Sequence, residues 1–363
     1  LLITAFYIPA GLTIPFAGIL SDHVGRKIVM GPALLIYGTG GLLAGLAALF
    51  FKENAYPYIL GARIIQGIGA GGTYQLAMAL SGDLIQNQER AQVLGLLEAA
   101  NGLGKVVSPL AGAAIGLIAW YMPFFVYGIL ALPIALAVLF IAQEAKIGQK
   151  GQAFSSYLKS LLQIMKEKGV NLGIAFSCGL IVLFSLFGLL SFFSDLLEKS
   201  FHLKIFARGL VIAIPVLAMA VTSYLFGIVL KKQMVKIMKW TIIGGLAMVV
   251  GGLFLFPLGL RILSKTLFAT LIGIGTGMAL PTLNTLITSS APTSERGLIT
   301  CLYGTVRFFG VAIGPPLFSL ATKYGENLIF WSDAVLVAAI AALAFLLIKP
   351  QQILPTALKG GGQ

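Results

Sequence analysis

Residues 18–27 read Gly-Ile-Leu-Ser-Asp-His-Val-Gly-Arg-Lys and connect two apolar stretches, residues 1–20 and 29–51. Each stretch has the length of about 20 residues that an α-helix needs to cross the hydrocarbon core of a bilayer. The charged side chains gather in the short segment between them. This part of the sequence therefore predicts two membrane-spanning helices that are joined by a tight loop at one membrane surface.

The composition of the whole chain agrees with a membrane protein. Hydrophobic residues make up 58% of the 363 residues, charged residues make up 10%, and the mean hydropathy is +0.97. Soluble domains have about 45–50% apolar and about 25% charged residues. The composition excludes a soluble domain, a disordered chain and a disulfide scaffold, since both cysteines lie in apolar stretches.

Eleven stretches are long and apolar enough to be spanning helices, and they are too long for the strands of a membrane barrel. We expect these helices at residues 1–20, 29–51, 56–80, 91–117, 119–142, 171–194, 209–230, 240–258, 266–289, 298–321 and 327–348.

The loops between these stretches alternate in charge. One set carries 15 of the 25 Lys and Arg residues, and the other set carries 7. The richer set is 21–28, 81–90, 143–170, 231–239, 290–297 and 349–363. Because cytoplasmic loops are enriched in Lys and Arg, we expect this set and the C-terminus in the cytoplasm of a cell. This bias also explains the net charge of +13 without a nucleic-acid partner.

The sequence matches itself without gaps when it is shifted by 206 residues. The shift places Gly67-Ile-Gly69 on Gly273-Ile-Gly275, Glu89-Arg90 on Glu295-Arg296, and Pro109 on Pro315. The span at 171–194 opens the second half, and its counterpart would precede Leu1. We therefore expect two six-helix halves, the first of which lacks its first helix here. Parallel repeats of this kind are a transporter plan, and the alternative is two fused halves with a structural role.

The repeat divides the chain into four parts. We expect an N-terminal helical half at 1–142, a cytoplasmic linker at 143–170, a C-terminal six-helix half at 171–348 and a cytoplasmic tail at 349–363. In the linker, apolar residues from Phe154 to Met165 recur at helical spacing with lysines between them. This pattern suits a helix in the membrane interface, or equally a connector helix packed under the bundle.

Residues 18–27 have the pattern G-x3-D-x2-G-R-K, which resembles the loop between the second and third helices of the major facilitator superfamily. The resemblance implies an all-α bundle of 6 + 6 helices around a central cavity. The matching residues are Gly18, Asp22, Gly25, Arg26 and Lys27. We expect Gly25 to allow a tight turn, and Asp22 to pair with basic groups and a neighbouring helix N-terminus.

Two further stretches resemble motifs of the same superfamily. Arg63-Ile-Ile-Gln-Gly-Ile-Gly-Ala70 resembles its fourth-helix motif, and residues 95–113 resemble the motif of its proton-coupled exporters. The latter contributes Gly95, Gly104, Ser108, Pro109 and Gly112, and it departs from the motif where Ser108 and Ala113 replace glycines. Small residues at these positions predict close helix packing.

Buried charges indicate the candidate transport site. Glu98 lies well inside the span at 91–117, and Asn101 and Lys105 follow it on nearly the same helix face. Arg307 is the repeat equivalent of Asn101, so we expect it to face the same cavity from the other half. We interpret Glu98 as a carboxylate that binds a proton or a substrate cation, or alternatively as a member of a structural ion pair with Lys105 or another buried cation.

Other charged residues receive separate roles. Arg63 is expected to help set the proton affinity of the carboxylate or to bind substrate, and the alternative is a capping or packing arginine. Asp22, Arg26, Asp83 and Arg90 are expected to form a gating network at the inner face, with a solvated loop as the alternative for Asp83 and Arg90. Two isolated loop histidines make no metal site, so we expect no metal and no cofactor.

These features predict a secondary active transporter and exclude an enzyme, because no catalytic motif is present. The favoured function is proton-coupled efflux of small amphipathic or cationic molecules by alternating access, as in multidrug exporters. The alternative is a metabolite, sugar, siderophore or organic-anion carrier, which the cations Lys105 and Arg307 would suit. We expect the protein to be a monomer in the cell membrane, with a small molecule and protons as its partners.

Overall fold

The computed structural model describes the chain except for residues 1, 86–88, 145–153, 291–295 and 354–363. The described residues are helical and contain no strand, as the sequence predicts. The helices are α1 (Leu2–Val24), α2 (Arg26–Phe51), α3 (Tyr56–Gly71), α4 (Tyr74–Leu84), α5 (Glu89–Gly116), α6 (Met122–Phe140), α7 (Phe154–Lys199), α8 (Ile205–Leu255), α9 (Ile262–Ser290), α10 (Arg296–Ser319), α11 (Ala321–Tyr324), α12 (Glu326–Leu347) and α13 (Pro350–Ile353), with 3₁₀ turns at Lys52–Asn54 and Phe256–Leu258.

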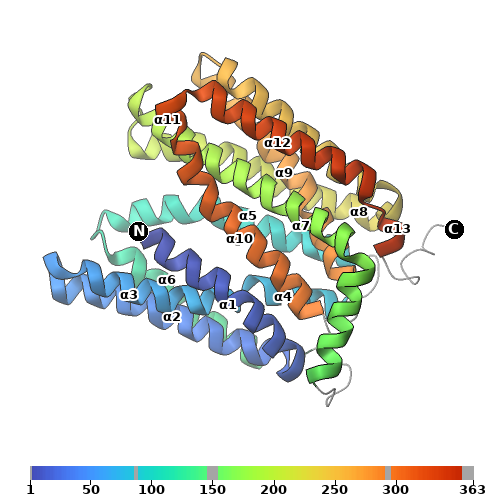
Figure 1. Ribbon diagram of the computed structural model, residues 1–363. Coiled ribbons are helices and arrows are strands. Elements are labelled where there is room, and N and C mark those ends of the chain that lie inside the picture. Colours follow the sequence, from blue (N-terminus) through green and yellow to red (C-terminus); the bar gives the residue numbers. More distant parts are fainter. Residues whose placement is uncertain (1, 86–88, 145–153, 291–295, 354–363) are drawn as a thin grey trace. The chain divides into compact units, whose positions relative to one another are not determined.

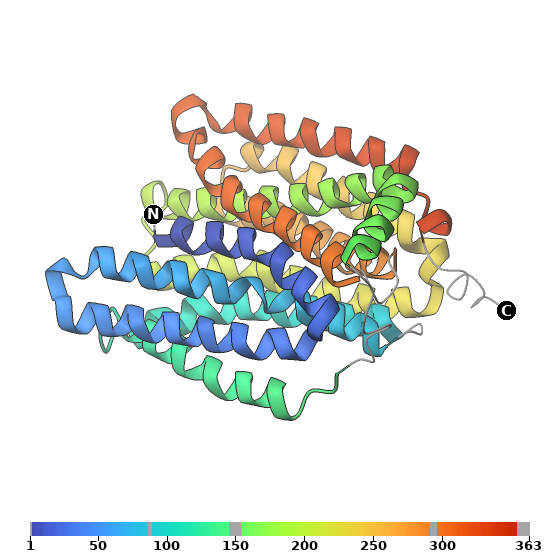
Figure 2. The ribbon, with the colours of Figure 1, turned by 60° about the horizontal axis from the view of Figure 1, so that its bottom comes forward.

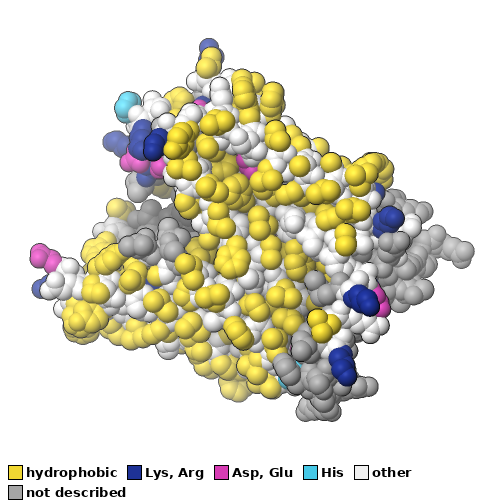
Figure 3. Space-filling view, in the orientation of Figure 1, with side chains coloured by type: hydrophobic (Ala, Val, Ile, Leu, Met, Phe, Trp, Pro, Cys, Tyr) yellow, Lys and Arg dark blue, Asp and Glu magenta, His cyan; other side chains and the backbone are white. Residues whose placement is uncertain are grey.

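Nine helical segments in the described part are long and apolar enough to cross a membrane. They cover nine of the eleven predicted spans. Figure 3 shows why these segments require lipid: hydrophobic side chains cover the flanks of the helices, and charged side chains gather toward the ends. Phe16, Phe140 and Leu260 are each more than two-thirds exposed, which water would disfavour and a bilayer accommodates.

The predicted span at 56–80 is interrupted, and the helix divides into α3 and α4 at Gly72 and Thr73. The amides of these two residues bond back to the carbonyls of Gly69 and Ala70, three positions earlier, which tightens the last turn of α3. The cluster of glycines at 67–72 explains the interruption, because glycine stabilises a helix interior poorly.

Two predicted connections are helical. Residues 231–239 continue α8, and no Gly or Pro occurs between Gly227 and Gly244 to end it. The predicted linker helix is the beginning of α7 and continues into the spanning segment. Most side chains in the apolar stripe of this linker helix lie outside the described part, so the interfacial role of the helix stays a prediction. The side chains of residues 231–236 lie outside the described part as well.

The helices form two compact units, each described here by itself. Unit 1 comprises residues 1–84, 111–162 and 291–308. Within it α2 packs on α3 and α6, and α3 also packs on α1, as Figure 1 shows for the blue helices. Its core includes Ile14, Met30, Leu76, Leu80 and the free thiol Cys301, contributed by α1, α2, α4 and α10.

Unit 2 comprises residues 85–110, 163–290 and 309–363. Within it α9 and α12 pack on α8, which is followed most easily in Figure 2. An aromatic cluster joins α7, α10 and α12 to the turn after α8: Phe330 stacks on Phe256 at 4.7 Å and meets Phe192 and Phe318 edge-on.

The two units divide two of the helices: unit 1 contains the start of α10, and unit 2 contains most of α5. The division into repeat-related halves at 1–142 and 171–348 stays a prediction.

Candidate functional site

A buried network of charges, which we call the ion network, consists of Asp22, Arg26, Asp83 and Arg296 in unit 1. Asp22 lies in the last turn of α1 and Arg26 is the first residue of α2. Gly25 between them has φ of 116°, a conformation that favours glycine, so the predicted tight turn is present. This turn brings the Arg26 guanidinium onto Asp22, four residues earlier.

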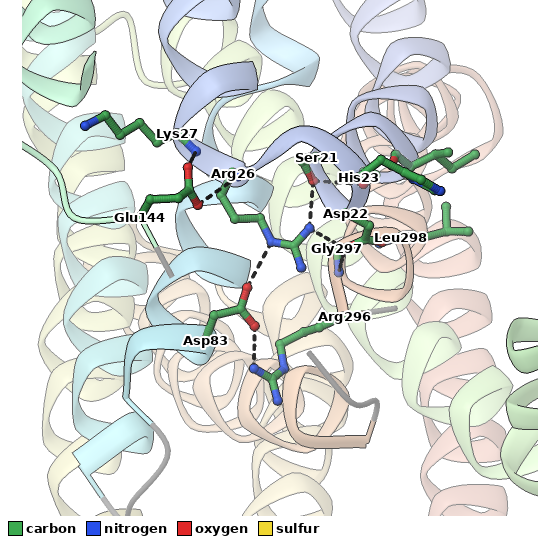
Figure 4. A network of polar contacts seen from close by, with 12 residues as sticks. Ser21, Asp22, His23, Arg26, Lys27, Asp83, Glu144, Arg296, Gly297 and Leu298 are labelled. Atoms are coloured by element: carbon green, nitrogen blue, oxygen red, sulfur yellow. Dashed lines mark hydrogen bonds and ion pairs between the residues drawn. The ribbon is translucent and has the colours of Figure 1, made fainter. Parts of the chain in front are cut away.

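Asp83, near the end of α4, holds two arginines at once (Figure 4). Its Oδ2 accepts a hydrogen bond from Arg26 Nε at 2.9 Å, and its Oδ1 accepts one from Arg296 Nη1 at 2.5 Å. Arg26 also donates to Ser21 Oγ, and Arg296 donates to the carbonyl of Gly82. The four charged side chains are all at most 7% exposed, so each charge depends on its partner rather than on water.

Asp22 also caps the N-terminus of α10. Its two carboxylate oxygens accept the amides of Gly297 and Leu298, both at 2.9 Å. A carboxylate at a helix N-terminus satisfies otherwise unpaired amides and interacts favourably with the helix dipole. The sequence predicted this kind of contact for Asp22 but did not identify α10 as the helix.

Arg296 was missed as a member of the ion network, and the predicted membership of Arg90 stays a prediction. The 206-residue shift places Arg90 on Arg296, so the repeat contained the signal. Arg90 lies in unit 2, where it donates to Ser289 Oγ at 2.9 Å and to the carbonyl of Ile85. Its contacts thus join α5 to the end of α9.

Glu144, after α6, is a third carboxylate at this end of unit 1, after Asp22 and Asp83. It accepts the backbone amides of Arg26 and Lys27, at 3.1 and 2.9 Å, and so caps α2 (Figure 4). Lys27 in turn donates from Nζ to the carbonyl of Ala142. These contacts attach the end of α6 to the loop that contains Gly25.

Glu98 is fully buried in unit 2, in the α5 segment that this unit contains. Its Oε2 accepts a hydrogen bond of 2.8 Å from Nδ2 of Asn284 on α9. Asn101 is half-buried on the same helix, and the side chain of Lys105 lies outside the described part. The sequence missed Asn284, although a lone amide within an apolar span was a detectable signal.

The two remaining candidate cations lie in unit 1 and face aromatic rings. Arg63 donates to Gln66 Oε1 at 2.6 Å, and its guanidinium lies 4.6 Å from the centroid of the Phe6 ring. Arg307 on α10 is buried, with its guanidinium 5.4 Å from the Tyr303 ring and 5.9 Å from the Tyr74 ring. Because Arg307 and Glu98 belong to different units, their common cavity stays a prediction.

The glycines of the exporter-like motif differ in their surroundings. A Cβ at Gly95 would lie 2.7 Å from the backbone Cα of Gly227 on α8, so α5 and α8 touch there. A Cβ at Gly104 would meet nothing within 4 Å, and one at Gly112 would make only an ordinary contact with Tyr127. Ser108 is exposed, and the side chain of Pro109 is not described. Gly95 is therefore the motif glycine that the α5–α8 packing requires.

We expect Gly95→Ala to lower the stability of the protein by about 1–3 kcal/mol, because the added methyl forces two backbones apart. Gly104→Ala is the matched control on the same helix, and it should be neutral or stabilising by up to about 1 kcal/mol through helix propensity. Thermal unfolding of both purified variants in detergent measures this difference. Equal melting temperatures would contradict the close α5–α8 contact.

The sequence pattern of the Major Facilitator Superfamily matches residues 1–315. The chain belongs to this superfamily. A bacillibactin exporter of Bacillus subtilis (strain 168) is 35% identical over 332 residues, which are 91% of this chain and 82% of that protein. The multidrug efflux protein YfmO of the same organism is 28% identical, over 89% of this chain and 77% of its own length. The multidrug transporter protein MdtP is 26% identical, and the match spans 66% of its length.

Solved structures show the same fold. The human organic anion transporter MFSD10 (TETRAN) has a TM-score of 0.78 at 19% identity, over 94% of this chain and 82% of that one. The proton:xylose symporter XylE has a TM-score of 0.76 at 16% identity, over 96% of this chain and 85% of that one. The predicted all-α fold is confirmed, and the protein is a multi-pass membrane transporter of a small molecule and not an enzyme.

Proposed function

We propose that this transporter is a proton-coupled exporter of an anionic, aromatic small molecule of the siderophore class. The similarity to a bacillibactin exporter, which covers most of both chains, supports export and this substrate class. The observation that carries the proposal is the pair Arg63 and Arg307 in unit 1, each held against aromatic rings within a membrane protein. A buried guanidinium binds anionic oxygens by charge-assisted hydrogen bonds.

The aromatic rings of unit 1 support an aromatic substrate. Tyr37, Phe6, Tyr7 and Phe308 follow one another with ring centroids 6.3, 5.2 and 5.6 Å apart. This chain of rings connects α2 and α1 to α10. Its second ring, Phe6, lies against the guanidinium of Arg63, and its last ring, Phe308, follows Arg307 in the sequence. Rings favour an aromatic group by stacking, while the two arginines attract its negative charge.

Glu98 is the residue to which we assign the transported proton. A carboxylate fully buried within the membrane is costly, and the neutral amide of Asn284 donates a hydrogen bond to the Glu98 carboxylate without balancing its charge. Protonation removes this cost, so the two charge states of Glu98 favour different helix arrangements. A proton that binds here in exchange for substrate would drive export.

The ion network serves as the gate in this proposal. It connects α1, α2 and α4 to the N-terminus of α10, so it must separate when these elements move apart. From the Lys and Arg bias we infer that this end and the C-terminus face the cytoplasm of a cell. The protein would then act as a monomer in the cell membrane, with the network intact when the cytoplasmic side is closed.

We expect Arg63→Gln to raise the KM for an anionic substrate about tenfold or more, because one charge-assisted hydrogen bond contributes about 1.5–3 kcal/mol. Transport of a cationic dye should not weaken. Arg261→Gln is the control, since this arginine is exposed in the turn before α9. Initial rates in proteoliposomes at several concentrations of the anionic substrate give the KM of each variant. A KM in Arg63→Gln equal to that of the wild type would count against the substrate assignment.

The function itself is tested by substrate-triggered proton movement. Proteoliposomes with an acidic interior receive bacillibactin or ethidium, and a fluorescent probe follows the pH gradient. We expect bacillibactin to collapse the gradient and ethidium to have little effect. A response to ethidium alone would favour the second candidate, multidrug efflux, which the similarity to YfmO and MdtP supports. No response to either compound would overturn proton-coupled export.

A further inference from the structure

Asp333 is a buried acid to which no role has been assigned. It lies on α12, seven residues from Glu326, and this distance is about 10 Å along the helix axis. The residue is 5% exposed and belongs to the buried stripe of α12, with Phe330, Ala334 and Val337. Asp333 therefore faces the interior of unit 2 rather than lipid or the helix end.

The carboxyl group of Asp333 has no hydrogen-bond partner among the described residues. Both of its oxygens are buried, and so is the equally unpartnered Oγ of Ser185 on α7. Ser185 is the polar neighbour of Asp333, close to it but outside hydrogen-bond geometry. The same helices touch one turn of α12 away, where Phe330 meets Phe192 at 5.4 Å.

The charged groups on the elements around α12 are engaged elsewhere. Lys265 of α9 binds Glu326 Oε1 at 2.5 Å, and Arg208 of α8 binds Glu198 of α7. Lys239 of α8 lies over the ring of Phe345, and Lys323 of α11 lies over the ring of Tyr324. Of the remaining described acids of α7, Glu167 is exposed and accepts a hydrogen bond from Gln163, and Asp195 is near the end of the helix, ten residues after Ser185. None of the described cations pairs with Asp333.

A carboxylate in such a place would bear the full cost of losing its hydration, which amounts to several kcal/mol per ion. A neutral carboxylic acid avoids most of this cost, and its one proton can reach a hydroxyl oxygen after a small rotation. Ser185 supplies such an oxygen on the facing helix. A metal cation would need several ligands, and the described residues contain no group of three or more His, Cys, Asp or Glu side chains that could hold one.

We propose that Asp333 and Ser185 form a proton-binding site between α7 and α12, in which Asp333 carries a proton at neutral pH. The site is separate from Glu98 and does not depend on the substrate. Its proton can leave only when water reaches the α7–α12 contact, so proton release accompanies separation of these two helices. Occupancy of the site thus couples the local pH to the packing of unit 2.

Infrared spectroscopy of the purified protein in lipid vesicles tests this proposal without transport. A protonated carboxyl gives a C=O band distinct from the bands of an ionised carboxylate. We expect Asp333→Asn to remove one such band from the spectrum at pH 7. Asp195→Asn is the matched control on α7 and should leave the band unchanged. A spectrum of Asp333→Asn with the same protonated-carboxyl bands as the wild type would overturn the proposal.

A second variant tests the pairing with serine. Ser185→Ala keeps the carboxyl and removes its polar neighbour, so the band assigned to Asp333 should remain and shift in frequency. An unshifted band would overturn the role of Ser185. Because these readouts need neither substrate nor a pH gradient, they remain decisive if proton-coupled export through Glu98 is wrong. The thermal unfolding of each variant verifies that it is folded.

Discussion

Asp83→Asn is expected to open the ion network and to make the buried thiol Cys301 accessible. The substitution leaves Arg26 and Arg296 facing one neutral amide in place of the carboxylate that both arginines bind. Removal of one partner from a buried ion pair costs about 3–5 kcal/mol, because the remaining charge stays buried without compensation. The α10 N-terminus, which contains Cys301, should therefore detach from α1 and α4 more often.

Thiol labelling measures this opening. Cys301 packs with Ile14, Leu76 and Leu80 in unit 1, and a Cys178→Ala background leaves it as the sole cysteine. If the substitution lowers the free energy of local opening at α10 by about 3 kcal/mol, the labelling rate of Cys301 rises roughly 100-fold. Glu53→Gln removes an exposed acid in the same unit and should leave the rate unchanged. Equal rates in the two variants would show that the network does not hold α10 in place.

Glu98→Gln is expected to reduce proton-driven transport to the level of vesicles without protein. Glutamine keeps the volume of the buried side chain, and its carbonyl can still accept the hydrogen bond from Asn284. The change in stability should therefore stay within about 1 kcal/mol. The variant loses only the ability to bind and release a proton, so the dependence of transport on pH should disappear with net export.

Substrate exchange separates coupling from binding in the same variant. Exchange of labelled for unlabelled substrate across the vesicle membrane needs no net proton movement, and we expect Glu98→Gln to retain it. Glu167→Gln is the control, because Glu167 is exposed on α7 and bonds only to Gln163 in the described structure. Proton-driven export at the wild-type rate and pH optimum would make Glu98 a structural partner of Asn284.

The positions of the spanning helices could be predicted from the sequence because hydropathy and helix length are local properties. Gly25 is a clear example: a glycine followed by Arg26 after an apolar stretch predicts a turn at the membrane surface, and its positive φ confirms that turn. Local patterns also misled at two places. The glycines at 67–72 interrupt a predicted helix, and the residues from 231 to 239 continue one.

The partners of the buried charges could not be predicted in this way. Asn284 is 186 residues from Glu98, and Arg296 is 213 residues from Asp83. The sequence indicated that each charge needs a partner, because an isolated ion within a membrane is costly. It offered Lys105 on the same helix as one candidate partner of Glu98, since only neighbours along one helix face can be read from spacing, and this pairing stays a prediction.

The sequence by itself determined the family, the membrane location and the burial of Glu98 within a span, because each of these follows from local composition and motif. Only the tertiary structure decided that Arg296 belongs to the ion network, that Gly95 and not Gly104 is a packing contact, and that Asp333 lies beside Ser185. These facts depend on which helices pack together. That choice is made by the sum of many weak side-chain contacts over whole helices, which no single motif contains.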